Sequence, residues 1–393
     1  MCGSIMQNTP ITGFRTKVFS EMVIALAANT SWYLWNFRRG LIKQLLSQGH
    51  EVLLVAPSDD TTPLLENMGC RYLSIEIDRK GKNPITELGL IIEYFRILKS
   101  QKPKYLFLFT VKPVIYGTVV AGLLGIVGIA TITGLGTVFI RRSLLTVVLK
   151  NLYQIPFRFC AAVFLQNKED GKLLLPKKKK PNAKIFYVAG SGVDLEYFRF
   201  SAEDVGNHEQ ETFTFIFIGR ILEDKGIREF IEASRVILGS HKGVEFQVVG
   251  PVDPGNQTGI SLKEIQDWQS EGVIRYLGKV DDVRPFVLSS SCVVLPSYRE
   301  GLPRSLLEAG AIGRPVIATQ VPGCKDVVIE GKTGFLCAPQ DSVDLAKKMA
   351  MVLKLSRQER LDMGARARVH IEKNFDEKVI IAQYLSVLSA STS

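Results

Sequence analysis

The feature that most constrains the fold is the alternation of short apolar runs with amphipathic stretches along almost the whole chain. An apolar run rich in β-branched residues is typical of a strand buried on both faces of a parallel sheet. Predicted strands of a first set lie at 22–28, 51–56, 71–75, 105–109, 126–132 and 162–166, with helices such as 37–48 and 88–100 between them. A second set lies at 213–218, 245–249, 274–276, 292–296 and 315–319. This order predicts an α/β, doubly wound fold.

The length of the chain predicts two such units. With 393 residues, of which 46% are hydrophobic, the chain exceeds the ceiling of about 250 to 300 residues for one core. Each set of strands therefore forms one Rossmann-like lobe. Ligands of open α/β sheets bind at the carboxyl ends of the strands, so two facing lobes predict a shared cleft.

The second set contains a pair of carboxylates with suggestive spacing. Glu300 and Glu308 flank the turn Gly301-Leu302-Pro303, which opens a predicted helix. Pro303 suits the first turn because it has no N–H to satisfy, and the N–H groups of Arg304, Ser305 and Leu306 can then receive a diphosphate. Glu308, about two turns further on, would share a face with Glu300 and accept hydrogen bonds from ribose hydroxyls. Alone, the pattern fits a capped surface helix equally well.

Positive charge suited to a diphosphate occurs in the same half of the chain. Arg220 and Lys225 flank one strand-to-helix turn, Gly219 to Gly226. Arginine can clamp phosphate oxygens with two hydrogen bonds, and lysine adds a mobile point charge. A lone pair of this kind would more often be two solvated charges, and the anion-binding turn downstream favours the functional interpretation.

These segments, with 322–327 and 331–336 after them, resemble the retaining glycosyltransferases of the GT-B type in family 4 (glycosyl transferases group 1). The resemblance covers the chain from about Val23 onward. Segments 29–38, 78–84 and 132–137 are most similar to bacterial enzymes that extend undecaprenyl-diphosphate-linked sugars for capsule, O-antigen or glycan assembly. The resemblance implies a hexosyltransferase that uses a nucleotide-sugar, with a UDP-linked N-acetylhexosamine as the donor suggested by that subgroup.

The resemblance also implies a domain plan. Residues 1–20 form an extension, 21–193 an acceptor-binding domain and 194–375 a nucleotide-sugar-binding domain, joined near the segment Gly192-Val193-Asp194. The helix at 376–393 is expected to cross back onto the first domain.

The resemblance assigns roles on both sides of the cleft. Glu300 faces the donor sugar, Glu308 the ribose, and Arg220 and Lys225 the leaving diphosphate, which makes Glu300, Arg220 and Lys225 the catalytic candidates. The full donor set adds Gly278 and Val280 beside the base and Gly301, Leu302, Pro303, Arg304 and Ser305 at the helix start. The acceptor set is Asn29, Thr30, Arg38, Lys112, Thr133, Gly134, Leu135 and Gly136.

The catalytic group on the acceptor side stays open. Many relatives place a histidine near the strand end that is occupied here by Thr110, Val111 and Lys112. The four histidines of this chain, His50, His208, His241 and His370, are expected to be exposed, so none is assigned a catalytic role.

Charge is divided unevenly between the halves. Residues 1–200 carry 26 Lys or Arg and 13 Asp or Glu, a net charge of +13, which leaves −3 for the remainder. Basic surface is attracted to anionic lipid, so the first lobe is expected to meet an anionic membrane surface, with Lys177 to Lys180 as the sharpest patch. A solvated loop is the alternative interpretation of that run. No nucleic-acid-binding motif accompanies the basic residues, so nucleic acid is excluded as a partner.

One uncharged segment, 113–140, is long enough to span a bilayer. Its six glycines from Gly117 to Gly136 interrupt any continuous helix, which favours a helix at 116–124 followed by a buried strand. The expected location is therefore the cytoplasm, peripheral to the inner face of the plasma membrane. Six scattered cysteines without a CxxC pair indicate core thiols in a reducing compartment, and the absence of an Asp-x-Asp motif predicts that no metal is required.

Three rival functions can be weighed against transfer. A glycosidase would use Glu300 and Glu308 as acid and nucleophile, but it has no need of a phosphate clamp. A sugar-nucleotide 2-epimerase shares the architecture and needs further acids and bases that the sequence does not reveal. A non-catalytic nucleotide-sugar-binding protein would keep Arg220 and Lys225 and transfer nothing.

Overall fold

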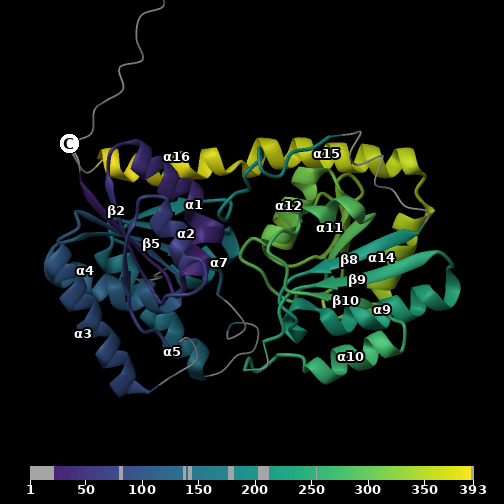
Figure 1. The fold of residues 1–393 in the computed structure, drawn as a ribbon, viewed down its shortest axis with the longest axis horizontal. Coiled ribbons are helices and arrows are strands. Elements are labelled where there is room, and N and C mark those ends of the chain that lie inside the picture. The colour runs from purple at the N-terminus through teal and green to yellow at the C-terminus, as the bar shows by residue number, and fades with distance from the viewer. Residues whose placement is uncertain are drawn as a thin grey trace, which may run out of the picture.

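The fold contains two separate parallel sheets, each covered by helices, which confirms the α/β prediction (Figure 1). The computed structural model describes residues 22–78, 83–135, 139, 144–175, 181–201, 212–253 and 255–390. The predicted extension at 1–20, Gly136 and Lys177 to Lys180 lie outside the described residues.

The first sheet has seven strands in the order β3-β2-β1-β4-β5-β6-β7. Its strands are β1 (Val23–Ala27), β2 (Glu51–Ala56), β3 (Arg71–Ser74), β4 (Tyr105–Phe109), β5 (Val127–Ile132), β6 (Ala162–Leu165) and β7 (Lys184–Tyr187). Its helices are α1 (Ser31–Ser47), α2 (Thr62–Asn67), α3 (Pro84–Gln101), the π-helix η1 (Pro113–Gly117), α4 (Thr118–Leu124), α5 (Leu144–Leu152), α6 (Gln154–Phe159) and α7 (Lys168–Leu174). The edge strand β7 was not predicted, because its ends are exposed and it begins with a lysine.

The second sheet has six strands in the order β10-β9-β8-β11-β12-β13. Its strands are β8 (Phe213–Ile218), β9 (Val244–Val249), β10 (Arg275–Gly278), β11 (Cys292–Leu295), β12 (Val316–Thr319) and β13 (Gly334–Cys337). Its helices are the 3₁₀ helix η3 (Glu223–Lys225), α9 (Ile227–Ser240), α10 (Leu262–Ser270), α11 (Arg284–Ser289), α12 (Arg304–Ile312), α13 (Cys324–Val327), α14 (Ser342–Lys354) and α15 (Arg357–Phe375). All pairings are parallel.

The last helix, α16 (Glu377–Ala390), belongs to the core of the first lobe although it follows the second. In Figure 1, α15 and α16 run one after the other along the top of both lobes. The junction is held by the segment that joins the lobes, because the Val193 N–H donates to the Phe375 carbonyl at 2.9 Å. Gly192 has a φ of +70°, and a Cβ there would lie 2.5 Å from the Glu377 Cα, so only glycine fits this junction.

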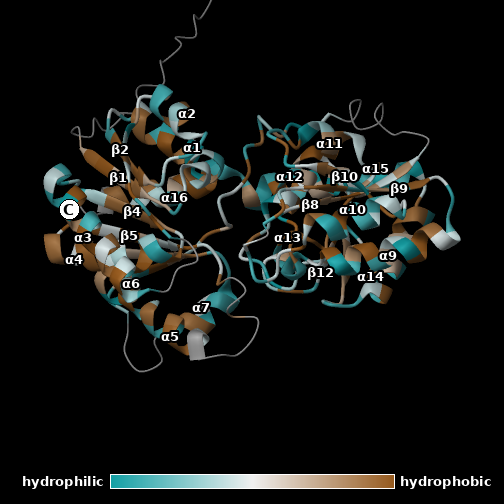
Figure 2. Ribbon diagram, turned by 60° about the horizontal axis from the view of Figure 1, so that its bottom comes forward, coloured by the Kyte–Doolittle hydropathy of each residue, from teal (hydrophilic) through white to brown (hydrophobic). Residues whose placement is uncertain are grey.

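The uncharged stretch from residue 113 forms η1, α4 and the buried strand β5, as predicted apart from the π-helical turn. Among the described residues, no helix has the length and apolar character needed to cross a bilayer. Figure 2 shows hydrophobic strands within each lobe. The cysteines Cys70, Cys160, Cys292, Cys324 and Cys337 are buried free thiols, which confirms them as core residues.

Tyr384 of α16 is buried in the core of the first lobe and helps to attach this helix to it. Its ring contacts Phe107, Phe109 and Phe164, with centroids 6.1, 6.2 and 4.3 Å away, and its hydroxyl lies 3.1 Å from Thr131 Oγ1. We expect Tyr384→Ala to lower the free energy of unfolding of the first lobe by about 3 to 5 kcal/mol, because a large buried ring is lost. Urea unfolding followed by circular dichroism measures this loss.

The matched control is Val379→Ala, because Val379 lies on the same helix with 53% of its surface exposed. Its free energy of unfolding should stay within about 0.5 kcal/mol of the unmodified protein. Equal stability of the two variants would contradict the assignment of α16 to the first core.

Candidate active site

The centre of the site is an ion pair between two strand ends of the second lobe. Strands β8 and β11 are neighbours, and the turns after them carry Lys225 and Glu300. The Lys225 ammonium contacts Glu300 Oε1, and both side chains are largely buried. The turns are bound together, because the Tyr298 N–H donates to the Asp224 carbonyl at 2.9 Å. A Cβ at Gly226 would lie 2.0 Å from the Pro296 carbonyl oxygen, so the turn requires glycine.

The start of α12 departs from the predicted geometry. Pro303 is the residue that caps the helix, with ψ 116°, and the first turn begins at Arg304. The Leu306 N–H donates to the Pro303 carbonyl at 3.2 Å, so it is not free for an anion as predicted. The first N–H groups of a helix have no acceptor within it, which leaves those of Arg304 and Ser305 to receive a ligand.

Glu308 is held by its own helix in this structure. Its Oε1 accepts a hydrogen bond from Arg304 Nε at 2.7 Å, and its side chain is 12% exposed. Burial raises the pKa of the Glu308 carboxyl, and the positive charge of Arg304 opposes that rise. The Arg304 guanidinium also donates to the Asn36 carbonyl of the first lobe and lies 5.2 Å from the centre of the Phe37 ring. The sequence did not reveal this bridge.

Arg220 lies apart from the central pair. Its side chain is 54% exposed, and its Nη1 is 3.8 Å from Asp253 Oδ2. The neighbouring strand ends converge at Gly250: its N–H donates to the Gly278 carbonyl at 2.8 Å, and a Cβ there would lie 1.8 Å from the Gly219 carbonyl oxygen. This packing brings Gly278 close to the turn that carries Arg220. Val280 is partly buried and packs against the core of the second lobe.

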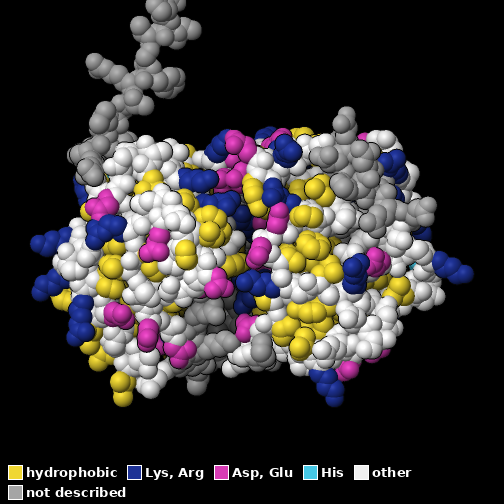
Figure 3. All heavy atoms as spheres, in the orientation of Figure 1, with side chains coloured by type: hydrophobic (Ala, Val, Ile, Leu, Met, Phe, Trp, Pro, Cys, Tyr) yellow, Lys and Arg dark blue, Asp and Glu magenta, His cyan; other side chains and the backbone are white. Residues whose placement is uncertain are grey.

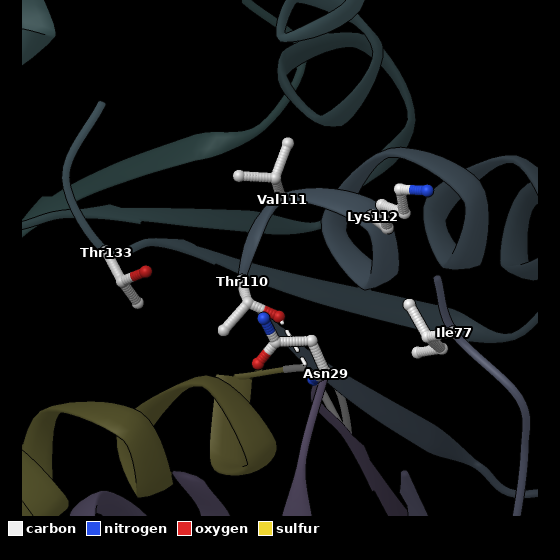
Figure 4. A pocket seen from close by; sticks show the side chains of 6 residues that line it. All are labelled: Asn29, Ile77, Thr110, Val111, Lys112 and Thr133. Carbon is white, nitrogen blue, oxygen red and sulfur yellow. Dashed lines mark hydrogen bonds between the residues drawn. The ribbon is translucent and has the colours of Figure 1, made fainter. Parts of the chain in front are cut away.

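A pocket of about 230 Å³ lies at the carboxyl ends of β1, β4 and β5 in the first lobe. It is lined by Asn29, Ile77, Thr110, Val111, Lys112 and Thr133 (Figure 4). The Asn29 N–H donates to Thr110 Oγ1 at 3.2 Å. Thr110 has a φ of +65°, a left-handed conformation that costs a β-branched residue about 1 to 3 kcal/mol and is found most often at functional sites.

Lys112 is the cation among these lining residues. Its ammonium contacts the Glu87 carboxylate of α3 and donates to the Asp78 carbonyl at 2.5 Å. In Figure 4 its side chain points away from Thr133. Lys112 was predicted as an acceptor residue, and Ile77 and Val111 are lining residues that the sequence did not single out.

Two members of the predicted acceptor set are buried away from the pocket. Arg38 is 2% exposed, donates to the Tyr33 hydroxyl at 2.9 Å and lies 4.2 Å from the centre of the Phe109 ring. The reason is helical register: Arg38 shares the inner face of α1 with Leu34 and Leu41. Leu135 is 5% exposed.

Thr30 has a structural task, since its hydroxyl caps α1 by accepting the Tyr33 N–H at 3.0 Å. The prediction of exposed histidines was wrong for His50, which is 4% exposed, and for His241 and His370, which are partly buried. His208 lies outside the described residues.

The two halves of the site meet at a pair of glycines. An ideal Cβ at Gly301 would lie 3.1 Å from the Thr133 carbonyl oxygen and 2.3 Å from Gln166 Oε1. A Cβ at Gly134 would lie 3.1 Å from the Gly301 Cα. The turn after Glu300 therefore packs directly on a wall of the first-lobe pocket, which places Glu300 beside that pocket.

Further contacts between the lobes surround the glycines. The Asn167 amide donates to the Gly301 carbonyl at 3.3 Å, and Lys325 pairs with Glu169 at 3.0 Å. Arg299 pairs with Asp170, whose pKa is raised by burial and lowered in turn by that arginine. These partners lie 129 residues (Arg299 and Asp170), 134 residues (Asn167 and Gly301) and 325 − 169 = 156 residues (Lys325 and Glu169) apart in sequence, so no local pattern could have paired them.

Metal ligands do not gather here: within the described ranges, no three His, Cys, Asp or Glu side chains are grouped as a metal ion would need. Cationic charge at this site comes from Lys225, Arg304 and Lys112. The arrangement can therefore hold an anion at the second lobe and a polar group at the first, with Glu300 between them.

Two family models match the chain. The model described as glycosyl transferases group 1 matches residues 212–354, and the model described as glycosyl transferase 4-like matches residues 23–167. The first range runs from β8 to α14 of the second lobe, and the second from β1 to β6 of the first lobe. Helices α7, α15 and α16 and strand β7 lie outside both ranges.

A relative of known activity spans almost the whole chain. The N,N'-diacetylbacillosaminyl-diphospho-undecaprenol alpha-1,3-N-acetylgalactosaminyltransferase of Campylobacter jejuni is 25% identical over 388 residues, which is 93% of this chain and 98% of that protein.

Solved structures share the fold. The sucrose-phosphate synthase of Thermosynechococcus elongatus has a TM-score of 0.78 and 18% identity, covering 95% of this chain and 99% of that one. Anabaena HepE, in complex with UDP and glucose, has a TM-score of 0.76 and 19% identity, covering 94% of this chain and 100% of that one. The chain is a glycosyltransferase of the GT-B fold and belongs to the glycosyl transferases of group 1, family 4.

Proposed function

We propose that this enzyme transfers a sugar, an N-acetylhexosamine, from a UDP-linked donor to a lipid-diphosphate-linked saccharide, with retention of the anomeric configuration. Such a step extends a lipid-linked glycan during capsule, O-antigen or glycan assembly. The Campylobacter relative supports the acceptor class and the class of sugar, because its name describes both and it aligns over nearly the full chain. The HepE complexes support UDP as the nucleotide of the donor.

The observation that carries this proposal is the contact between Gly301 and Thr133. It joins the turn of Glu300, on the lobe with the anion-binding helix start, to the wall of a polar pocket on the other lobe. A transferase needs a donor and an acceptor hydroxyl within reach of one another, because a positioned pair reacts far faster than separate molecules. The glycines at the contact supply that proximity.

On the donor side, the charge that develops on the departing diphosphate is the quantity to stabilise. Lys225 and the N–H groups of Arg304 and Ser305 are fixed before the reaction, so they stabilise this charge without reorganisation. Arg220 is exposed and can swing onto a phosphate. Because these groups supply positive potential, we propose that transfer requires no divalent cation.

The donor must also displace existing contacts. Glu308 can accept hydrogen bonds from ribose hydroxyls through its second carboxylate oxygen, to which Arg304 does not donate. Glu300 can turn from Lys225 toward the sugar once the phosphate neutralises the charge of that lysine. On the acceptor side, the six lining side chains include no carboxylate, so the pocket itself offers no carboxylate nucleophile for a covalent intermediate. Asn29 and Thr110 can orient the attacking hydroxyl.

None of the three rival functions gains support from the relatives. The family models and the Campylobacter relative are transferases, and none points to a glycosidase, to a 2-epimerase or to a non-catalytic binding protein. Because the proposed acceptor is lipid-anchored, we also propose that the enzyme works at the cytoplasmic face of a membrane, as a peripheral protein beside anionic headgroups.

The direct test is a transfer assay with radiolabelled UDP-N-acetylglucosamine or UDP-N-acetylgalactosamine and an undecaprenyl-diphosphate-linked saccharide, run with and without a chelator. We expect label to enter the organic phase, UDP to accumulate in equal amount, and the chelator to change neither. Proton NMR of the product should show the α-linkage of the donor. Recovery of all the label as unreacted UDP-sugar, with none in a lipid product, would contradict the proposal. A β-linked product would contradict retention.

Lys225→Ala tests the diphosphate clamp. We expect kcat/KM for the donor to fall by about 10²- to 10³-fold, because a preorganised cation is lost where phosphate charge develops. The control is Lys242→Ala, since Lys242 is an exposed lysine of the same lobe outside the site. Equal kinetics for the two variants would remove Lys225 from the mechanism.

We expect the titration of Glu308 to set the acid limb of the pH profile of kcat/KM for the donor. Burial raises the pKa of the Glu308 carboxyl above that of an ordinary glutamate, about 4.3. As pH falls through this raised pKa, the ionised carboxylate that accepts hydrogen bonds from ribose hydroxyls is lost. The kcat/KM for the donor should therefore be full above the raised pKa and decline below it. Glu308→Gln keeps an acceptor oxygen and does not titrate, so its acid limb should flatten. An unchanged limb would assign the titration to another group.

A further inference from the structure

The amino-terminal part of the outer face of α3 exposes apolar side chains where a helix normally turns polar residues to water. The exposed positions Ile85, Leu88, Gly89, Ile92, Arg96 and Lys99 recur at helical spacing, so they form one stripe, which we call the α3 stripe. Ile85 is 81% exposed, Leu88 57% and Ile92 43%. The opposite face, with Leu90, Tyr94 and Leu98, is buried in the core, so the amino-terminal half of the helix is apolar on both sides.

The α3 stripe contains no acidic residue. The acidic residues of α3 are Glu87 and Glu93, both half-buried, and Glu87 is paired with Lys112. From residue 84 to residue 160 the chain carries nine Lys or Arg and two Asp or Glu, a net charge of +7. This composition, apolar at one end of the stripe and basic at the other, matches a helix that lies on an anionic lipid surface.

Neighbouring helices extend the same character. Helix α4 packs on α3 and α6 packs on α4, and each adds one exposed apolar side chain, Leu123 (71% exposed) and Phe159 (54% exposed). The Phe159 ring lies against Gly122, 3.7 Å from where a Cβ would stand, and the Arg158 guanidinium is 5.4 Å from the ring centre. An aromatic ring flanked by arginine suits the boundary between headgroups and acyl chains. Figure 2 shows these helices together on the side of the first lobe, and Figure 3 shows hydrophobic side chains over the lower end of α3 with Lys and Arg along the adjoining edge.

The stripe also lies close to the pocket. Glu87, which holds Lys112 of the pocket, follows Ile85 by two residues on α3, about 3 Å along the helix axis. A bilayer against the apolar end of the stripe would therefore present its headgroup layer near the pocket that takes the acceptor.

We propose that the α3 stripe, with Leu123 and Phe159, is the surface by which the enzyme docks on an anionic lipid bilayer. This inference deepens the proposed function, on which it rests for its purpose, because it names how the protein meets a lipid-anchored acceptor. The apolar side chains enter the interface, and Arg96, Lys99 and Arg158 contact anionic headgroups. Docking in this orientation fixes which end of the first lobe faces the membrane.

The test is flotation of the full-length protein with vesicles of phosphatidylglycerol and phosphatidylethanolamine, or of phosphatidylcholine alone, without donor or acceptor. We expect binding to the anionic vesicles that weakens as salt rises from about 0.1 M to about 1 M, since the Debye length falls from about 10 to about 3 Å. The triple variant Ile85→Ser, Leu88→Ser, Ile92→Ser should need at least about tenfold more lipid for half-binding. Arg96→Gln with Lys99→Gln should lose about tenfold on anionic vesicles only.

A matched control is available on the second lobe. Val236, Leu262 and Val343 are 56, 52 and 61% exposed, so the triple change of these residues to serine removes similar apolar surface. This control should float like the unmodified protein, and thermal unfolding should show that both triple variants keep the fold. Equal flotation of the two triple variants, or no flotation of the unmodified protein, would overturn the proposal. A change in the sedimentation of the lipid-free triple variant of Ile85, Leu88 and Ile92 would instead assign the stripe to contact between two copies of the protein. That result would also overturn the proposal.

Activity separates this inference from the proposed function. With an acceptor that carries a short, water-soluble prenyl chain, the transfer rate of the triple variant of Ile85, Leu88 and Ile92 (the α3 variant) should match that of the unmodified enzyme. With acceptor embedded in vesicles, its transfer rate should fall about tenfold, in line with its weaker binding to the vesicles. Vesicle docking without any lipid product would leave the docking surface standing and remove the proposed acceptor. Transfer to embedded acceptor that the α3 variant performs equally well would remove the docking surface alone.

Discussion

The contact between the Gly301 turn and the Thr133–Gly134 turn is the constraint on which the rest of the site depends. A side chain at Gly301 or Gly134 would meet the backbone of the opposite turn at about 3 Å. The two lobes can approach this closely only because neither residue has a side chain. The contact sets Glu300, with its partner Lys225, against the wall of the first-lobe pocket. Ion pairs between Arg299 and Asp170 and between Lys325 and Glu169 surround this contact and are its supports. The proposed transfer depends on this geometry, because its donor and acceptor residues lie on different lobes.

The sequence predicted the fold well because parallel strands buried on both faces leave continuous apolar runs. The predicted runs 105–109 and 292–296 match β4 and β11 closely, whereas the edge strands β7 and β13 were not predicted. The ends of β7 are exposed, and β13 is a four-residue strand that begins with a glycine, so neither shows the long apolar run of a central strand. The resemblance and the local turns led to Lys225, Glu300 and Lys112. The structure removed Arg38 and Leu135 from the pocket, because side-chain burial depends on helix register and on packing between segments, which a motif does not encode.

Arg304 shows most clearly what a linear pattern omits. As part of the turn after Glu300 it was assigned only a backbone role. In the fold its guanidinium binds Glu308 and reaches the Asn36 carbonyl of the other lobe, so one side chain connects the ribose-binding candidate with α1. The long reach of arginine and its several donors permit both contacts at once. A donor bound at Glu308, as proposed, would therefore lie beside a contact between the two lobes.

The measurement that tests the central claim most directly is a crystal structure of the enzyme with UDP bound. We expect the diphosphate to lie within hydrogen-bond distance of the Lys225 ammonium and of the N–H groups of Arg304 and Ser305. We also expect the ribose to lie at Glu308 and the diphosphate to face the turn of Thr133 across the cleft. UDP bound elsewhere, with the Lys225 and Glu300 pair undisturbed and the start of α12 empty, would contradict this expectation.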